Sequence, residues 1–200
     1  MMDKFFPAIR NPKELRTELV RKSLHVLIAL VPLLAGINRP LTIALLLGGS
    51  LLYSLLELLR LSGFPVPVIS TLTALASRRR DQGHFVRGPV TLGAGALLAL
   101  LLYPPQAASI AVYTLAFGDG IASLVGKTAG RIRPSFLLGK SVEGSLACFT
   151  VSFIAAYRVS LNCRIALLAA MTGTLVDIFP LGDYDNLVMP LAVGLAVRDL

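Results

Sequence analysis

Residues 40–59 read PLTIALLLGGSLLYSLLELL, and this stretch decides the fold class. A transmembrane helix needs about 20 mostly apolar residues, and the only charged residue here is Glu57. The whole chain of 200 residues has the same character, with 55% hydrophobic residues, 15% charged residues and a mean hydropathy of +0.75. A soluble domain has about 25% charged residues. We therefore expect an all-α, polytopic integral membrane protein in which residues 1–200 form a single membrane-embedded domain.

Several apolar stretches qualify as membrane spans, the shorter ones with help from packing or local bilayer thinning. They cover residues 20–37, 40–59, 88–104, 107–126, 144–158, 164–180 and 187–198. We expect about seven transmembrane helices from this pattern. The stretch 64–77 is apolar but short and contains two prolines, so it adds an eighth span only if it crosses.

The basic residues orient this arrangement. The formal net charge is +8, and cytoplasmic loops carry an excess of Lys and Arg. A seven-span chain with a cytoplasmic N-terminus leaves few basic residues on the outside: Arg39, Arg158, Arg164 and Arg198. In this orientation residues 1–18 form a cytoplasmic amphipathic lead-in, and residues 78–87 and 127–143 form cytoplasmic loops.

A basic balance can also indicate nucleic-acid binding. The chain has no Trp and no polar stretch with interleaved aromatic residues, so it lacks the features of a nucleic-acid module. The charge instead favours membrane orientation and phosphate binding. Cys148 and Cys163 stand in apolar runs without metal-site spacing and are interpreted as small core residues. The oligomeric state is left open.

Three acidic residues lie within or at the edge of apolar runs, namely Glu57, Asp119 and Asp177. An ionised side chain at bilayer depth costs about 2.5–3.5 kcal/mol, so such residues usually have a partner or a function. Glu57 is one helical turn from Arg60, which favours an ion pair at a helix end. Asp119 lies between two glycines, which favours a ligand site. Asp177 is interpreted equally well as a satisfied core group or as a site residue.

The segment 12–25 leads into the first span as an amphipathic helix. Glu14, Glu18, Arg21 and His25 form one polar stripe along it. Because the stripe continues into an apolar span, Arg21 and His25 must face protein or water rather than lipid. For His25, a buried and satisfied histidine and a contact to phosphate or substrate are both open.

The central part of the chain gathers the groups that a polyphosphate needs. Small residues recur at Gly118, Gly120, Ala122, Gly126 and Gly130, so a ligand can approach the backbone closely. The cations Arg131, Arg133 and Lys140 follow, and then Ser141 and Glu143. Nucleoside triphosphates are bound by such cations and by a divalent ion. Asp119 is the expected ligand of that ion and Glu143 a possible second one. Gly126 and Gly130 also fit an ordinary helix-packing motif.

Other nucleotide and metal motifs are absent from the sequence. A P-loop ending at Lys127 would need glycine at position 121, which is Ile, and one ending at Lys140 would need glycine at 134, which is Pro. The kinase H-R-D and D-F-G sets and the H-E-x-x-H motif are also missing. His25 and His84 have no cysteine partners nearby, so a zinc site is not expected.

Together these motifs resemble the family of CTP-dependent lipid-alcohol kinases, which includes dolichol kinase, phytol kinase and CTP-dependent diacylglycerol kinase and is related to phosphatidate cytidylyltransferases. Three segments carry the resemblance, over residues 18–25, 119–145 and 185–190. They are Glu18-x-x-Arg21-Lys22-x-x-His25; Asp119-x-x-Ala122-x-x-x-Gly126-x-x-x-Gly130 with Lys140-Ser141-x-Glu143-Gly144-Ser145; and Asp185-Asn186-Leu-Val-Met-Pro190. Two positions depart from the family pattern: Ser141 stands where the family usually has Thr, and Asp177 is the nearest acid where it has Glu.

The resemblance implies transfer of the γ-phosphate of CTP to the hydroxyl of a membrane lipid alcohol at the cytoplasmic face, with Mg²⁺ as cofactor. It implies Asp119, Lys140, Glu143 and Asp185 as catalytic residues, with Asp119, Glu143 and Asp185 as metal ligands and Glu143 or Asp185 as the base. The implied nucleotide site comprises Gly118, Asp119, Ala122, Gly126, Gly130, Arg131, Arg133, Lys140, Ser141, Glu143 and Gly144. Arg21, Lys22, His25 and Asn186 would form its polar mouth.

Two other functions remain open from the residues. A cytidylyltransferase would use the same nucleotide but form a CDP-lipid and release pyrophosphate. A small ion-coupled transporter would use Asp119 and Asp177 as coupling acids in broken helices. The lipid acceptor also stays open among polyprenol or dolichol, a phytol-like alcohol and diacylglycerol. The loop 78–87 is either a topogenic basic loop or a lid over the nucleotide.

Overall fold

The computed structural model describes residues 12–67, 70–71, 73 and 83–200. Within these residues the chain is helical and contains no strand, which confirms the all-α class. The elements are α1 (Pro12–Leu27), α2 (Leu30–Leu61), α4 (Gly88–Leu102), α5 (Pro105–Tyr113), η3 (Thr114–Asp119), α6 (Gly120–Thr128), η4 (Ser135–Leu137), α7 (Val142–Ser160), α8 (Cys163–Ile178) and α9 (Asp185–Val197). Residues 1–11 of the predicted lead-in, residues 68–69, 72 and 74–77 of the stretch 64–77, and residues 78–82 lie outside the described part.

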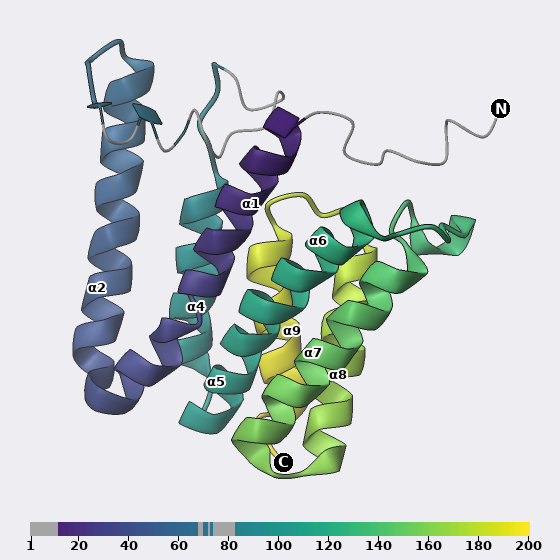
Figure 1. Cartoon of the computed structure of the whole chain (residues 1–200). Helices are drawn as coiled ribbons and strands as arrows, with labels where there is room; N and C mark the ends of the chain where they lie inside the picture. The colour runs from purple at the N-terminus through teal and green to yellow at the C-terminus, as the bar shows by residue number, and fades with distance from the viewer. Residues whose placement is uncertain (1–11, 68–69, 72, 74–82) are drawn as a thin grey trace, which may run out of the picture.

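The first two predicted spans meet at a break in the backbone. Asn38 has φ −151° and ψ 94°, which is not helical, and Figure 1 shows the chain turning back in this region. The Asn38 side-chain oxygen accepts a hydrogen bond from the Leu41 N–H at 3.0 Å, as an N-cap residue does. Pro40 follows where a new helix can begin, because its missing N–H is not needed there.

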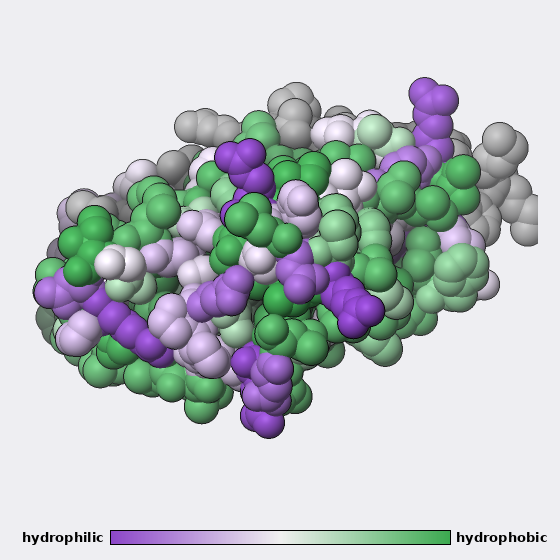
Figure 2. All heavy atoms as spheres, turned by 90° about the horizontal axis from the view of Figure 1, so that it is seen from below, coloured by the Kyte–Doolittle hydropathy of each residue, from purple (hydrophilic) through white to green (hydrophobic). Residues whose placement is uncertain are grey.

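Among the described residues, three helical segments are long and apolar enough to cross a membrane: Thr17–Leu61, which contains the break at Asn38, Pro105–Thr128 and Val142–Ser160. Large apolar side chains are exposed along α2, including Leu45, Leu51 and Leu55, and surface of this kind is suited to contact with lipid. Figure 2, a view from below, shows apolar groups over much of the surface, with polar side chains interspersed. These features indicate a membrane protein, whereas the number of crossings stays a prediction.

A π-helical turn interrupts the long helix that runs from Pro105 to Thr128. It is η3, and it lies between α5 and α6 with Asp119 as its last residue. Asp119 and most of the turn are buried, and η3 contacts α1, α7, α8 and α9 as well as its chain neighbours. Single π turns inside α-helices often occur at functional sites. This one places Asp119 where the elements converge.

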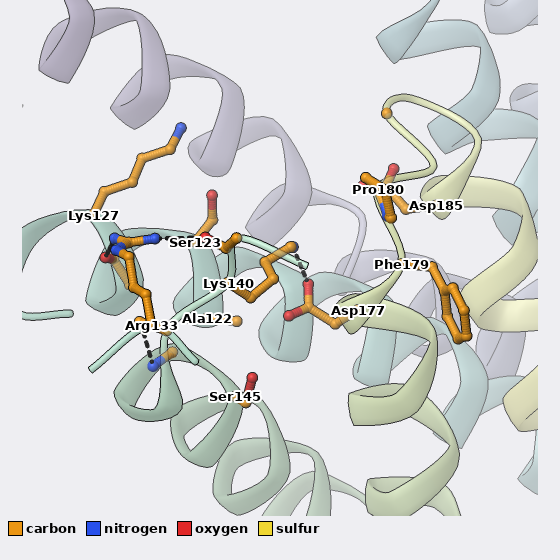
Figure 3. A pocket seen from close by; sticks show the side chains of 15 residues that line it. Ala122, Ser123, Lys127, Arg133, Lys140, Ser145, Asp177, Phe179, Pro180 and Asp185 are labelled. Atoms are coloured by element: carbon orange, nitrogen blue, oxygen red, sulfur yellow. Dashed lines mark hydrogen bonds and ion pairs between the residues drawn. The ribbon is translucent and has the colours of Figure 1, made fainter. Parts of the chain in front are cut away.

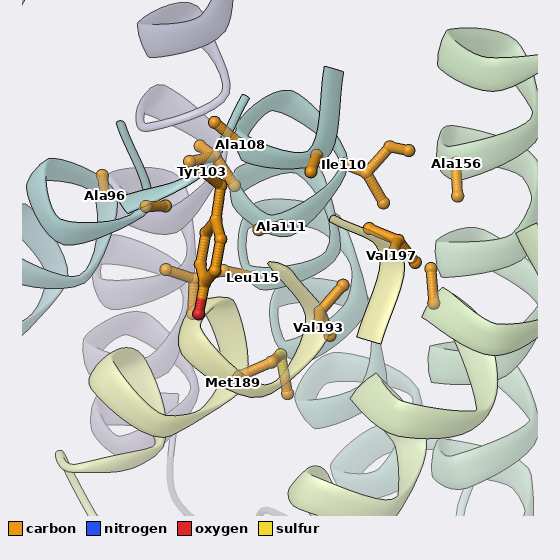
Figure 4. Close-up of a cluster of buried hydrophobic side chains, with 14 of the residues drawn as sticks. Ala96, Tyr103, Ala108, Ile110, Ala111, Leu115, Ala156, Met189, Val193 and Val197 are labelled. Carbon is orange, nitrogen blue, oxygen red and sulfur yellow. The ribbon is translucent and has the colours of Figure 1, made fainter. Parts of the chain in front are cut away.

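Small residues allow the helices to approach one another closely around this turn. Ala96 and Ala99 of α4, Ala111 of α5 and Ala169 of α8 are completely buried in the same core, part of which is drawn in Figure 4. Close backbone approach between small residues is the usual basis of helix packing in membranes. The Tyr103 hydroxyl adds a hydrogen bond of 2.7 Å to the Leu191 carbonyl in α9.

The predicted ion pair between Glu57 and Arg60 is confirmed. The Glu57 carboxylate accepts two hydrogen bonds of 2.8 Å from Arg60, as the spacing predicts, and a third of 3.0 Å from the Val86 N–H. It is completely buried, so these donors compensate for its desolvation. Glu57 therefore connects α2 with the segment that precedes α4.

Gly95 is the position where this packing is least tolerant. A Cβ added there would collide with the backbone carbonyl of Asn186 at the start of α9. We expect Gly95→Ala to destabilise the protein by about 1–3 kcal/mol, since backbone must shift to relieve the overlap. Thermal unfolding in detergent measures this. Gly49→Ala in α2 is the control, because nothing lies within 4 Å of its added Cβ; equal stability of the two variants would contradict the packing.

Candidate functional site

A buried ion cluster joins α1 to the π turn. The Lys22 Nζ lies 2.6 Å from Asp119 Oδ2 and donates a second hydrogen bond of 3.1 Å to the Asp119 carbonyl. His25 Nδ1 lies 3.0 Å from the same carboxylate oxygen. All three residues are about 4% exposed. A buried charge needs a partner of this kind, so Lys22 and His25 hold Asp119 rather than forming an open mouth.

Glu18 forms a second connection from α1, in this case to α6. Its carboxylate accepts a hydrogen bond of 2.8 Å from the Ser123 hydroxyl and lies 2.6 Å from Lys127 Nζ. Arg21 lies 3.2 Å from Glu18 and 3.7 Å from Asp183. Glu18 and Arg21 of the predicted polar stripe therefore face protein, where they form ion pairs with other elements or within α1, whereas the side chain of Glu14 lies outside the described part.

Beside these contacts lies a cavity of about 310 Å³, shown from close by in Figure 3. Helix α6, the segment that leads into α7, the end of α8 and the loop before α9 surround it. Its lining is Ala122, Ser123, Gly126, Lys127, Arg133, Gly139, Lys140, Ser141, Gly144, Ser145, Asp177, Phe179, Pro180, Gly182 and Asp185. The cavity thus combines three cationic and two acidic side chains with small residues.

Lys140 and Asp177 form the central pair of the cavity. Lys140 Nζ donates a hydrogen bond of 2.8 Å to Asp177 Oδ1, drawn as a dashed line in Figure 3. Burial disfavours the charged amine, but the neighbouring Asp177 carboxylate outweighs this effect and raises the pKa of Lys140. Asp177 therefore fits both interpretations of its sequence position: it has a partner, and it lines a site.

The small residues of the segment 119–145 allow α6 and the residues after it to pack against the start of α7. A Cβ at Gly130 would lie 2.7 Å from Ser141 Cβ, and one at Gly144 would lie 3.1 Å from Gly126 Cα. Ser141 caps α7 by accepting a hydrogen bond of 3.1 Å from the Gly144 N–H. Gly126, Ser141 and Gly144 also line the cavity, so the same residues allow helix packing and leave space for a ligand.

Two charged residues hold the loop between α6 and α7. Arg133 donates hydrogen bonds of 2.7 Å and 2.6 Å to the carbonyls of Gly139 and Gly126. Glu143 accepts hydrogen bonds from the backbone N–H groups of Arg131 at 2.9 Å and Ile132 at 3.2 Å. Glu143 is partly exposed and, like Arg131, is not among the residues that line the cavity. Its contacts are those of a residue that orders the loop.

Asp185 lines the cavity at the start of α9, just before the apolar stretch 187–198. Burial, followed by the negative charge of Asp119, raises its pKa to about 6. Asn186 points elsewhere: its side chain donates to the Thr91 hydroxyl at 3.0 Å and to the Gly88 carbonyl at 3.4 Å. It therefore holds α9 against α4 and positions Asp185.

The expected metal ligands make different contacts in the structure. In the described part of the chain, no group of three or more His, Cys, Asp or Glu side chains is close enough to hold an ion. Asp119 belongs to the ion cluster, Glu143 to the loop and Asp185 to the cavity. Mg²⁺ commonly uses only one or two carboxylates and completes its shell with phosphates and water. The carboxylates of Asp177 and Asp185 in the cavity fit that donor set.

Sequence reasoning missed part of the lining. Lys127, Phe179, Pro180 and Gly182 were not expected there. The signals in the sequence were the position of Lys127 directly after Gly126 and a short polar break between two apolar stretches at 181–186. The described end of the loop 78–87 reaches the same break, since Arg87 donates to the Tyr184 hydroxyl at 3.2 Å. The rest of that loop, and with it the lid prediction, lies outside the described residues.

The sequence is similar to CTP-dependent diacylglycerol kinase 1 of Saccharomyces cerevisiae, with 26% identity over 140 residues. The match covers 68% of this chain and 48% of the relative, so the chain spans about half the length of the curated relative it matches. No family model and no solved structure matches the chain. The similarity supports the resemblance to CTP-dependent lipid kinases that the motifs carry.

The ion cluster of Lys22, His25 and Asp119 leads to a prediction about stability. Lys22→Met removes the cation next to buried Asp119, and we expect a loss of about 3–5 kcal/mol because the carboxylate stays buried without its partner. Adding Asp119→Asn to this variant should recover part of the loss, which chemical or thermal unfolding in detergent measures. Arg198→Met is the control, since Arg198 pairs with exposed Asp199. A Lys22→Met protein as stable as this control would contradict the assignment.

Proposed function

We propose that the protein is a CTP-dependent kinase that transfers the γ-phosphate to the hydroxyl of a membrane lipid alcohol. The observation that carries this proposal is the cavity itself, where Lys127, Arg133 and Lys140 line one space with Asp177 and Asp185. The similarity to a CTP-dependent diacylglycerol kinase supports CTP as donor and a lipid as acceptor. The acceptor class spans diacylglycerol, polyprenol and phytol-like alcohols.

Phosphoryl transfer depends mainly on positioning and on neutralising charge. The acceptor oxygen forms a bond to the γ-phosphorus, the bond to the β–γ bridging oxygen breaks, and CDP leaves. Lys140 is assigned to the transferring phosphoryl group, and Arg133 supports it through the loop that it holds. Mg²⁺, when bound, would neutralise charge on the phosphates, and Asp177 is assigned as its ligand once Lys140 turns from Asp177 to phosphate.

The hydroxyl proton is assigned to Asp185. A carboxylate whose pKa is about 6 accepts a proton near neutral pH more readily than an ordinary exposed one. The geometry favours Asp185 over Glu143, which lies outside the lining and is occupied by backbone N–H groups. The proposed site opens at the cytoplasmic side, where a soluble nucleotide and a lipid hydroxyl can meet.

Removing the positive charge of Lys140 tests the proposed reaction. We expect Lys140→Met to lower kcat by about 10²–10³, the typical effect of losing one charge-stabilising group, while Arg198→Met keeps wild-type activity. The measurement uses γ-labelled CTP, purified protein and a panel of lipid alcohols, with label followed into lipid. Label in pyrophosphate would indicate the cytidylyltransferase instead, and solute uptake without nucleotide would indicate a transporter.

A comparison of Asp177 and Asp119 variants tests which of these two residues binds Mg²⁺. Asp177→Asn should raise the Mg²⁺ concentration needed for half-maximal activity by about tenfold or more, because one charged ligand is lost. Asp119→Asn, outside the lining, should lower stability without this shift. Mg²⁺ titrations of both variants, corrected for the folded fraction, measure the difference. A shift in Asp119→Asn alone would return the metal role to Asp119.

A further inference from the structure

An apolar groove of about 570 Å³ opens on the side of the bundle between α1 and α7. Helix α1 and its continuation contribute Val26, Ala29, Leu30 and Leu33, the π turn and α5 contribute Phe117 and Tyr113, and α7 contributes Ala155, Arg158 and Val159. Both α1 and α7 pack on α6 and on η3. Helices α1 and α7 therefore form the two sides of the groove, and α5 and η3, which carry Tyr113 and Phe117, form its base.

The groove begins where the buried ion cluster ends. Val26 follows His25 in α1, and Phe117 precedes Asp119 by two residues in η3. His25 and Asp119 are 3.0 Å apart, so the first residues beyond this contact on each side become the upper walls of the groove. The groove wall continues from Val26 at the end of α1 to Leu30 and Leu33 at the start of α2.

We infer that this groove holds the hydrocarbon chain of the lipid acceptor, with the chain's polar end next to the ion cluster. This inference rests on the proposed function. The walls are almost entirely aliphatic and aromatic, and the one charged member, Arg158, is exposed at the end of α7. Its alkyl stem can cover apolar surface while its head reaches water.

The physical role of such a groove is orientation. A bilayer is as apolar as the groove, so moving a chain from lipid into it gains little hydrophobic free energy. Packing against fixed walls instead restricts the chain and keeps its hydroxyl at one depth, close to the site. Positioning of this kind acts on the rate of reaction, because small displacements of a reacting group cost up to about a hundredfold.

Filling the groove tests the inference. We expect Leu33→Trp and Ala155→Trp to lower kcat/KM for a long-chain lipid alcohol by about tenfold to a hundredfold, with the KM for CTP and the rate on a short-chain alcohol unchanged. Leu45→Trp in α2 is the matched control, since Leu45 and Leu33 are 60% and 59% exposed and Leu45 is not part of the groove. Equal kinetics in Leu33→Trp, Ala155→Trp and Leu45→Trp would overturn the inference.

A binding measurement that needs no nucleotide gives an independent result. A lipid alcohol with a diazirine in its chain, incorporated in phosphatidylcholine vesicles with the wild-type protein, should label peptides around Leu33, Phe117 and Ala155. Excess unlabelled lipid alcohol should displace this label, whereas extra phosphatidylcholine should not. Label spread equally over the exposed leucines of α2 would show bulk lipid only and would overturn the groove.

The two measurements distinguish failure of the groove from failure of the proposed function. Displaceable label in the groove without phosphate transfer from CTP to any alcohol would keep the groove and refute the kinase. Phosphate transfer with evenly spread label and no effect of the tryptophans would keep the kinase and refute the groove. Variants that do not fold leave the labelling of the wild-type protein as the deciding result.

Discussion

The contact between Lys22 and Asp119 is the interaction on which the rest of the structure depends. It is a buried ion pair of 2.6 Å, and it joins the N-terminal helix to the π turn inside a different helix. A carboxylate with no cation could not remain at this depth. With α1 in this position, Glu18 contacts Ser123 and Lys127 of α6. The interface between α1 and α6 therefore includes polar contacts.

Two regions with different chemistry lie near this contact. In one, α6, α7, α8 and the loop before α9 surround a charged cavity. In the other, α1 and α7 diverge over η3 and leave an apolar groove. A lipid-alcohol kinase must bring a highly charged nucleotide to a substrate that remains in the membrane. The proposed function and the proposed chain site use these two regions.

The cavity shows how one residue can serve structure and chemistry together. Ser141 caps α7, Gly126 and Gly144 let α6 and α7 approach, and all of them line the space. Lys140 stands just before this cap and is paired with Asp177 from α8. A phosphate that replaces Asp177 as the partner of Lys140 would exchange one charge-assisted contact for another. In the structure the half-buried cation of Lys140 is therefore paired with Asp177.

The sequence by itself determined the helical class, the apolar stretches, the break near Asn38 and the segments that carry the resemblance to CTP-dependent lipid kinases. These features are local: hydrophobic periodicity, proline and glycine positions and cap residues act within one or two helical turns. The Glu57–Arg60 pair, three residues apart, was predictable for the same reason.

Only the tertiary structure decided which charged groups meet. Lys22 finds Asp119 across 97 residues and Lys140 finds Asp177 across 37, and no local pattern contains such pairings. The π turn ends at Asp119, whose carboxylate lies in the ion cluster with Lys22 and His25, and Glu143 accepts hydrogen bonds from the loop backbone. Partner choice for a buried charge is settled by desolvation, and desolvation depends on the packing of all the helices around it.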